Sequence, residues 1–209
     1  MTNSGANTTV TTSMPFPAIE WWCYAINASD IIVDINEHYR KMTFRNRYRI
    51  SGSNNPVLLS IPLQSGRNQR IPMKDVMIFN EDNWQVRHWR TLVSVYKRTP
   101  FFEYYEASLQ SLFEQEYIHL VDFNTSTLQW VQKQLKLKLL ESFSTDYKSH
   151  YPNSIIDLRE IASFSTSKLS FPKYYQIFEE RIGFQENLSI LDLLFSEGPN
   201  TLNWLKENF

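Results

Sequence analysis

The sequence predicts a mixed α/β protein of the α+β kind, in which an N-terminal strand-rich sheet packs against C-terminal helices. Two observations predict this class. Before residue 80 the apolar residues form short β-branched runs or alternate with polar residues, whereas after residue 80 they recur at helical spacing. Strands followed by helices are typical of this architecture, and they leave the topology of the sheet open.

The size and composition predict one domain with a short appendage. The chain has 209 residues, of which 42% are hydrophobic, enough for one sizeable core. Residues 1–13 consist mainly of Thr, Ser, Asn, Gly and Ala. Because such a segment buries too little surface to offset the entropy lost on ordering, we expect a disordered tail there. Residues 14–209 are then expected to form the single domain.

The first half of the domain should contain most of the strands. A short helical segment is expected at residues 18–27, followed by a buried strand in the β-branched run of residues 31–35. Residues 42–51 alternate between apolar side chains and arginines, which predicts a half-buried strand. The segment SGSNNP is a turn, and residues 57–63 return as a second strand, so the two should form a hairpin. A further strand is expected at residues 75–79.

The second half should be mainly helical. Asn80 or Asp82 can cap a helix that runs to about Lys97. Residues 140–170 show weak periodicity and are expected to form a loop with one short strand. Ser189 and Asp192 have the spacing of a capping pair for residues 190–195. Two more helices are expected at residues 101–116 and from about 124 to 135, and a last one begins at Pro199 and ends near Asn208.

Charge and cysteine content exclude some classes of function. The net charge of −1 and the pI near 6.4 do not indicate a nucleic-acid partner. The single cysteine, Cys23, permits no internal disulfide and fits a reducing compartment. Neither a secretory signal nor an apolar run of about 18 residues is present, so we expect a cytoplasmic protein without membrane insertion. The oligomeric state is not predictable from these features.

His88 is the first candidate for chemistry. It lies on the apolar arc of the helix predicted after Asp82, one turn after Trp84. Two interpretations stay open. His88 is either a core histidine with a hydrogen-bonding neighbour, or a general base in a pocket where Trp84 forms a stacking wall.

An arginine ladder is the second candidate. Arg45, Arg47 and Arg49 share one face of the predicted strand, and three adjacent guanidiniums require anions. These anions are either internal carboxylates such as Glu37 or a bound phosphate or carboxylate. Asn46 falls on the apolar face, where its amide must find partners, either in the protein or on a ligand. Because His88 and Asn46 both interrupt apolar faces, we expect them to share one polar site.

Several common motifs are absent from the sequence. Neither a GxGxxG nor a GxxxxGK[ST] loop occurs, and no GxSxG elbow is present. The four histidines and Cys23 lack metal-ligand spacing. We therefore expect no cofactor and no metal. Cys23 lies in an aromatic segment and is expected to be an inert buried thiol.

Long segments of the chain resemble the WbqC-like family of bacteria, most closely its Bacteroidetes-type members. The first segment, EHYRKMTFRNRYRI, is followed by LLSIPL and by NWQVRHWRTLVSVYKRTPFFEYYE, and the chain closes with GFQENLSILDLLFSEGP. Together these matches span roughly residues 14–209. His38, Arg40 and Met42 depart from the family pattern, which has Asn, Gln and Gln there, so the polar detail of this segment differs.

The resemblance implies a function in surface-polysaccharide (O-antigen) biosynthesis. With the features above, it leads us to expect a transferase that modifies a sugar or nucleotide-sugar by acyl or aminoacyl transfer. The residues expected to be catalytic are His88 and Glu37. The residues expected to bind a small anionic or sugar substrate are Tyr39, Lys41, Arg45, Asn46, Arg47 and Trp84. The alternative is a non-catalytic binding or scaffold protein, whose basic helix face, with Arg87, Arg90, Lys97 and Arg98, contacts an acidic partner.

Overall fold

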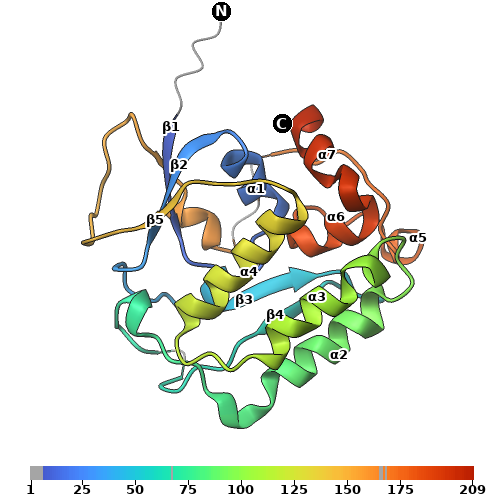
Figure 1. Cartoon of the computed structure of the whole chain (residues 1–209), viewed down its shortest axis with the longest axis horizontal. Coiled ribbons are helices and arrows are strands. Elements are labelled where there is room, and N and C mark those ends of the chain that lie inside the picture. Colours follow the sequence, from blue (N-terminus) through green and yellow to red (C-terminus); the bar gives the residue numbers. More distant parts are fainter. Residues whose placement is uncertain (1–6, 67, 165–166, 168) are drawn as a thin grey trace, which may run out of the picture.

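The computed structural model describes residues 7–66, 68–164, 167 and 169–209, and it confirms the mixed α/β class. Its strands form a four-stranded parallel sheet and a separate antiparallel hairpin. Figure 1 shows the parallel sheet at one side of the molecule, the helices α2 and α3 at the opposite side, and the hairpin between them. The strands are β1 (Asn7–Thr12), β2 (Ala28–Asp34), β3 (Arg47–Ile50), β4 (Val57–Ser60), β5 (Glu141–Phe143) and β6 (Ile156–Asp157).

The parallel sheet has the order β5-β2-β1-β6. β1 and β2 are joined through helix α1 (Ile19–Ala25) in a βαβ unit, and their register places Thr12 beside Asp34 at the carboxyl ends. β5 and β6 lie at the two edges and are contributed by a segment that is far away in the sequence. The sheet is therefore not built only from the N-terminal half of the chain.

The prediction of a disordered tail is wrong for residues 7–13. β1 is an inner strand, and the side chains of Thr9, Thr11 and Thr12 are buried. The indole Nε1 of Trp21 donates a hydrogen bond of 2.8 Å to the hydroxyl of Thr11. β-Branched threonines suit a strand, and the backbone partners come from β2 and β6, which compensates for the low hydrophobicity of this segment. Residues 1–6 lie outside the described part of the chain.

The predicted hairpin is present, but its first strand is shorter than expected. β3 and β4 pair antiparallel, with Tyr48 opposite Leu59. A 3-10 turn at Phe44–Asn46 precedes β3 and interrupts the alternation, so that Arg45 and Asn46 are both buried. The strand expected at residues 75–79 is not formed. A 3-10 turn occupies Met73–Asp75, and residues 77 and 78 make only isolated bridges.

The predicted helices are found, with shifts at their ends. Asn80 and Asp82 lie in a 3-10 turn ahead of α2, whose N-cap residue is Asn83. α4 begins at Leu120, before the predicted start, and Asn124 lies inside it. The helices after α1 are α2 (Trp84–Tyr96), α3 (Phe102–Glu114), α4 (Leu120–Gln134), α5 (Glu179–Ile182), α6 (Ile190–Glu197) and α7 (Thr201–Asn208).

One hydrophobic cluster connects the sheet, the hairpin and the helices. Phe16, in the loop after β1, lies near its centre and packs against the rings of Tyr48, Phe113, Phe123 and Trp130. This loop is therefore anchored from several sides. None of the helices in the described residues has the length and hydropathy required to cross a membrane.

Candidate functional site

The site is a cavity of about 360 Å³ at the carboxyl ends of β1 and β6. β2 and β5 lie on one side of β1, whereas β6 lies on its other side. The strand order therefore reverses between the neighbouring strands β1 and β6, which makes this position a topological switch point. In open parallel sheets, ligands bind outside the carboxyl ends of the strands at such a switch point. The volume lies within the range of about 300–1,000 Å³ that is common for small-molecule sites.

Four segments form the walls of the cavity. They are the loop after β1 with one side of helix α1, the strand β3 with Phe44, the end of β6 with the segment that follows it, and the segment before α6. Trp21, Tyr24, Phe44 and Phe164 contribute aromatic rings to these walls. An apolar wall with a few polar groups is typical of a binding site for a small organic molecule.

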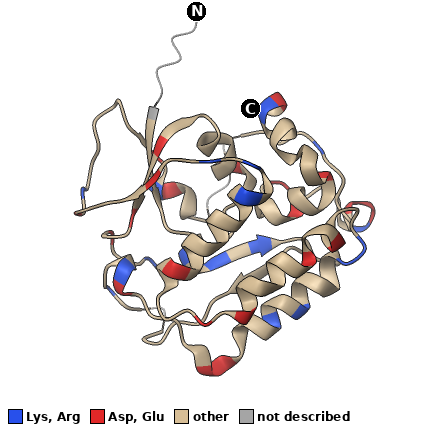
Figure 2. Cartoon of the chain, viewed as in Figure 1, with Lys and Arg blue, Asp and Glu red and all other residues tan. Residues whose placement is uncertain are grey.

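Among the described residues that line the cavity, Arg47 and Arg49 are the cationic ones. They lie on the same face of β3, which Figure 2 shows as a basic strand in the middle of the molecule. The guanidinium of Arg47 lies 5.7 Å from the ring centre of Phe164, and that of Arg49 lies 5.9 Å from that of Phe44. The aromatic walls thus hold both guanidiniums in place through cation–π contacts.

Neither guanidinium is neutralised by a carboxylate of the described residues. Arg49 donates to the backbone oxygens of Glu186 and Asn187, at 3.4 and 3.1 Å, and Arg47 contacts the sulfur of Met42. The Nε atoms of both side chains are buried and lack a hydrogen-bond partner in the described structure. Burial lowers the pKa of Arg49 from its usual value, although arginine remains charged. Such half-buried cations are suited to binding an anion.

Two acidic residues at the cavity already have cationic partners. The carboxylate of Asp157 accepts hydrogen bonds of 2.6–3.1 Å from Arg159, and Glu160 pairs with Arg40. Burial acts to raise the pKa of Asp157, but the hydrogen bonds from Arg159 outweigh it and lower this pKa. The hydrogen bond from Arg40 lowers the pKa of Glu160. These carboxylates are therefore not available to neutralise Arg47 or Arg49.

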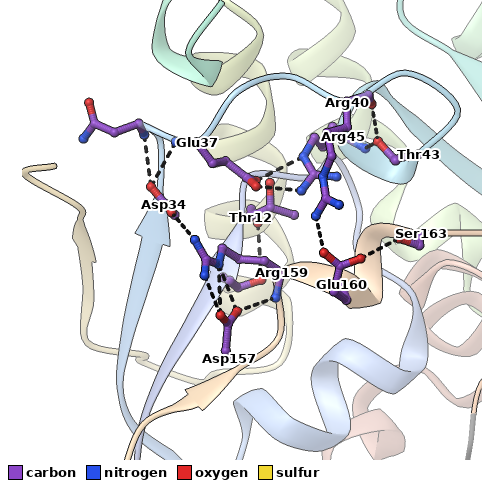
Figure 3. A network of polar contacts seen from close by, with 12 residues as sticks. Thr12, Asp34, Glu37, Arg40, Thr43, Arg45, Asp157, Arg159, Glu160 and Ser163 are labelled. Carbon is purple, nitrogen blue, oxygen red and sulfur yellow. Dashed lines mark hydrogen bonds and ion pairs between the residues drawn. The ribbon is translucent and has the colours of Figure 1, made fainter. Parts of the chain in front are cut away.

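Arg159 connects the cavity segment to the carboxyl end of the sheet. Figure 3 shows its guanidinium between Asp157, at the end of β6, and Asp34, at the end of β2. The carboxylate of Asp34 also accepts hydrogen bonds from the backbone amides of Asn36 and Glu37. This network fixes the segment after β6 relative to the inner strands, and thereby one wall of the cavity.

His88 lies in the core and does not line the cavity. It is 3% exposed, and its Nε2 lies 3.2 Å from the carbonyl oxygen of Ser60. Because a carbonyl only accepts, Nε2 carries the proton and Nδ1 accepts from the hydroxyl of Tyr48, at 3.1 Å. Burial lowers the pKa of His88 to about 4, so the ring is neutral at pH 7. His88 thus positions the side chain of Tyr48, which points from β3 into the core, on the face opposite to Arg47 and Arg49.

Glu37 and Arg45 form a buried ion pair. Arg45 is 0% exposed, and its Nε and Nη2 donate to the two carboxylate oxygens of Glu37 at 3.0 and 2.7 Å. Figure 3 shows this pair beside the Arg159 network. The arginine ladder is therefore divided: Arg45 has an internal anion, whereas Arg47 and Arg49 face the cavity.

The remaining predicted site residues have protein partners. Asn46 donates to the carbonyl of Ile61 at 2.8 Å and accepts from the hydroxyl of Tyr39 at 3.1 Å. Trp84 is buried and donates to Asn80, and Lys41 is exposed and contacts Asn68. The polar site expected to contain both His88 and Asn46 is not part of the cavity: the two side chains bind the carbonyls of the adjacent residues Ser60 and Ile61, and neither lines the cavity. Of the predicted site residues, only Arg47 lines the cavity.

Sequence reasoning missed three residues at the cavity: Glu20, Asn187 and, as a binding residue, Arg49. Arg49 shares the face of Arg47, and this signal was available in the alternation of the strand. Glu20 and Asn187 are 167 residues apart and gave no such signal. As for metals, no group of three or more His, Cys, Asp or Glu residues in the described ranges is placed to hold one.

Comparison with known proteins gives one match. The family model described as the WbqC-like protein family matches residues 13–162. This range contains the cavity residues of the first three walls up to Ile161, but it ends before the wall that precedes α6. No curated protein and no solved structure matches the chain.

Proposed function

Because the chain belongs to the WbqC-like protein family, we propose that it is a biosynthetic transferase that modifies a sugar or a nucleotide-sugar. The resemblance described above associates this family with surface-polysaccharide assembly, and the transferred group in this proposal is an acyl or aminoacyl group. The cavity supports the proposal because it combines aromatic walls with two cationic groups. An anionic sugar derivative needs both features.

The observation that carries the proposal is the pair Arg47 and Arg49. Both face the cavity, and neither has a carboxylate partner among the residues that the structure describes. A half-buried guanidinium is costly unless an anion compensates for its lost hydration. A phosphate or carboxylate of the substrate provides this anion, and the arginine fork matches its geometry.

Because His88 lies in the core, the proposal gives it a positioning role in place of the expected role of general base. In the proposal, its neutral ring holds the hydroxyl of Tyr48 in the core behind β3, the strand that carries Arg47 and Arg49. Both ring nitrogens are engaged, and a pKa of about 4 makes the ring a poor base at neutral pH. Glu37 likewise has an indirect role in the proposal: its ion pair with Arg45 holds the segment that precedes Arg47.

Calorimetric titration with UDP-glucose and glucose 6-phosphate tests the proposal. Arg47→Lys keeps the charge but loses the fork, and we expect it to weaken binding by about ten- to a hundredfold, since a charge-assisted hydrogen bond contributes ~1.5–3 kcal/mol. The matched control is Arg90→Lys on the exposed side of α2, which should leave binding unchanged. Equal affinities in the wild type, Arg47→Lys and Arg49→Lys would contradict the proposal.

A second candidate function is a non-catalytic binding or scaffold protein. The placement of His88 in the core, bonded to a backbone carbonyl, favours it. Its docking surface is the basic side of α2 with the turn that follows it, where Arg90 on the helix and Lys97 and Arg98 directly after it are exposed. The charge reversals Arg90→Glu and Lys97→Glu distinguish the two functions. They should abolish capture of an acidic partner but leave the binding of sugar phosphates intact.

A further inference from the structure

Glu20 is a buried carboxylate without a cationic partner. It is the second residue of α1, is 9% exposed and lines the cavity. No lysine, arginine or histidine of the described chain lies within salt-bridge distance of it. Glu20 lies in the first turn of α1, where the helix dipole favours a negative charge, so a carboxylate can be kept at the cavity wall without an ion pair.

Asn187 holds Glu20 in one orientation. Its side-chain Nδ2 donates to Oε2 of Glu20 at 2.9 Å, and its Oδ1 accepts from the backbone amide of Glu20 at 3.0 Å. The other carboxylate oxygen, Oε1, has no hydrogen-bond partner among the residues described. Glu20 therefore presents one fixed, unengaged acceptor at the cavity.

The same asparagine also fixes the cationic side of the cavity. Its backbone carbonyl accepts a hydrogen bond of 3.1 Å from Arg49. Asn187 has a φ of 53°, a left-handed conformation that asparagine adopts more readily than most residues. This conformation lets one residue hold Glu20 with its side chain and Arg49 with its backbone. Asn187 thereby fixes the distance between the Glu20 carboxylate and the Arg49 guanidinium before a ligand binds.

We infer that the Glu20 carboxylate binds a hydroxyl or amino group of the ligand whose anionic group Arg47 and Arg49 hold. This inference rests on the proposed function and deepens it. A carboxylate only accepts hydrogen bonds, so its partner on the ligand must be a donor. The cavity then selects molecules that carry an anion at one end and a hydroxyl or amine at the other. Sugar phosphates and amino-sugar phosphates belong to this class, whereas inorganic phosphate has no separate hydroxyl or amine that could reach Glu20.

Calorimetric titrations with three probes test the inference: glucose 6-phosphate, glucosamine 6-phosphate and inorganic phosphate. We expect Glu20→Gln to weaken the binding of at least one sugar phosphate by about tenfold and to leave inorganic phosphate unaffected, because only the charge-assisted bond is lost. Glu20→Gln keeps the size of the side chain and an oxygen for Asn187. The matched control is Glu103→Gln, an exposed glutamate on α3 outside the cavity.

The outcomes separate this inference from the proposed function. If none of the probes binds, or if Arg47→Lys changes nothing, the proposed function fails and the inference fails with it. If the sugar phosphates bind through Arg47 but Glu20→Gln binds them as tightly as the wild type, only the inference is overturned.

Thermal unfolding provides an independent readout of a structural role. Glu20→Gln keeps the side-chain size and an oxygen for Asn187 and loses only a modest helix-terminus charge interaction, so the midpoint of thermal unfolding should change little. A large decrease of the midpoint would show that Glu20 serves the fold, and it would also overturn the inference.

Discussion

At the scale of single residues, burial shifts the pKa values of two titratable groups in opposite directions. Burial lowers the pKa of His88 to about 4 and raises that of Asp192 to about 6. Asp192 accepts hydrogen bonds from the hydroxyls of Tyr96 and Tyr174, at 2.7 and 2.8 Å, which limit this rise. Between pH ~4 and ~6 both groups are therefore mainly neutral in the folded protein, whereas a histidine in the unfolded chain is largely charged below pH ~6.5.

The pH dependence of stability should therefore contain two opposing parts. His88 has a lower pKa in the folded state than in the unfolded state, so its contribution is present above pH ~6.5 and is lost as the pH falls towards 4. Asp192 has a raised pKa, so its contribution is present below pH ~4 and is lost as the pH rises towards 6. The two partly cancel in this interval.

Urea denaturation between pH 4 and 7 checks this prediction. His88→Gln removes the histidine part, and the loss of stability on acidification should become smaller than in the wild type. Asp192→Asn removes the opposing part, so the loss should become larger. If both variants followed the wild-type pH profile, displaced only by a constant, neither pKa would be shifted as described.

Ser189 is expected to contribute to stability through two hydrogen bonds. Its hydroxyl accepts from the backbone amide of Leu191 as the N-cap of α6, and it donates to the carbonyl of Phe16 at 3.0 Å. The predicted cap is present, although its partner is Leu191 rather than Asp192. Ser189→Ala should lower the free energy of unfolding by ~1–3 kcal/mol. Ser111→Ala on α3 is a control, since its exposed hydroxyl bonds only the preceding turn of its own helix, and an equal effect of both substitutions would refute the special role.

Residue patterns in the sequence predicted part of the site. The alternation around Arg47 correctly indicated an arginine that faces away from the core. The sequence could not show that Arg45 differs from Arg47. The 3-10 turn at Phe44–Asn46 turns Arg45 inward, and this turn depends on packing that the sequence does not display. Glu20 and Asn187 meet only through the tertiary fold, so no local pattern could connect them.

At the scale of elements, β1 shows where composition misleads. Its threonines and its single valine resemble a polar tail, yet Val10 is fully buried and pairs with β2 and β6. Local periodicity located the helices to within a few residues, because a helix is stabilised by contacts near in sequence. A parallel strand depends on distant partners, so the composition of β1 alone did not reveal it.

Removal of β1 should therefore abolish folding. Deleting residues 1–12 takes away an inner strand and leaves the backbone groups of β2 and β6 unpaired. We expect the circular dichroism and the thermal transition of this variant to lose their cooperative form. Val10→Asp, which places a charge at a fully buried position, should have a similar effect. A cooperative transition near the wild-type midpoint in both variants would contradict the inner position of β1.

At the scale of the whole molecule, the edges of the parallel sheet are its weakest parts. β5 pairs with β2 over three residues, and β6 pairs with β1 over two. By contrast, α2, α3 and α4 pack into the continuous core. The short edge strands also explain why the sequence predicted a loop over residues 140–170, since two or three residues carry no recognisable period.

Hydrogen exchange should reproduce this difference. We expect the amides of β5 and β6 to exchange faster than those in the middle of α2, α3 and α4, because local opening of these two edge strands exposes little apolar surface. A bound sugar phosphate should slow exchange in the segment after β6, which forms a cavity wall. Mass spectrometry of peptic fragments measures both effects, and uniform protection across the chain would contradict them.

The bond between Ser189 and Phe16 joins residues that are 173 positions apart in the chain. Synthesis proceeds from the N-terminus, so the loop after β1 must wait for almost the entire chain before this partner becomes available. Closing such a long loop is also entropically slow, which delays this contact in refolding as well as in translation. A fragment limited to residues 13–162 lacks Asn187 and Ser189 altogether. Ligand-binding competence should consequently be among the last properties that the newly made chain acquires.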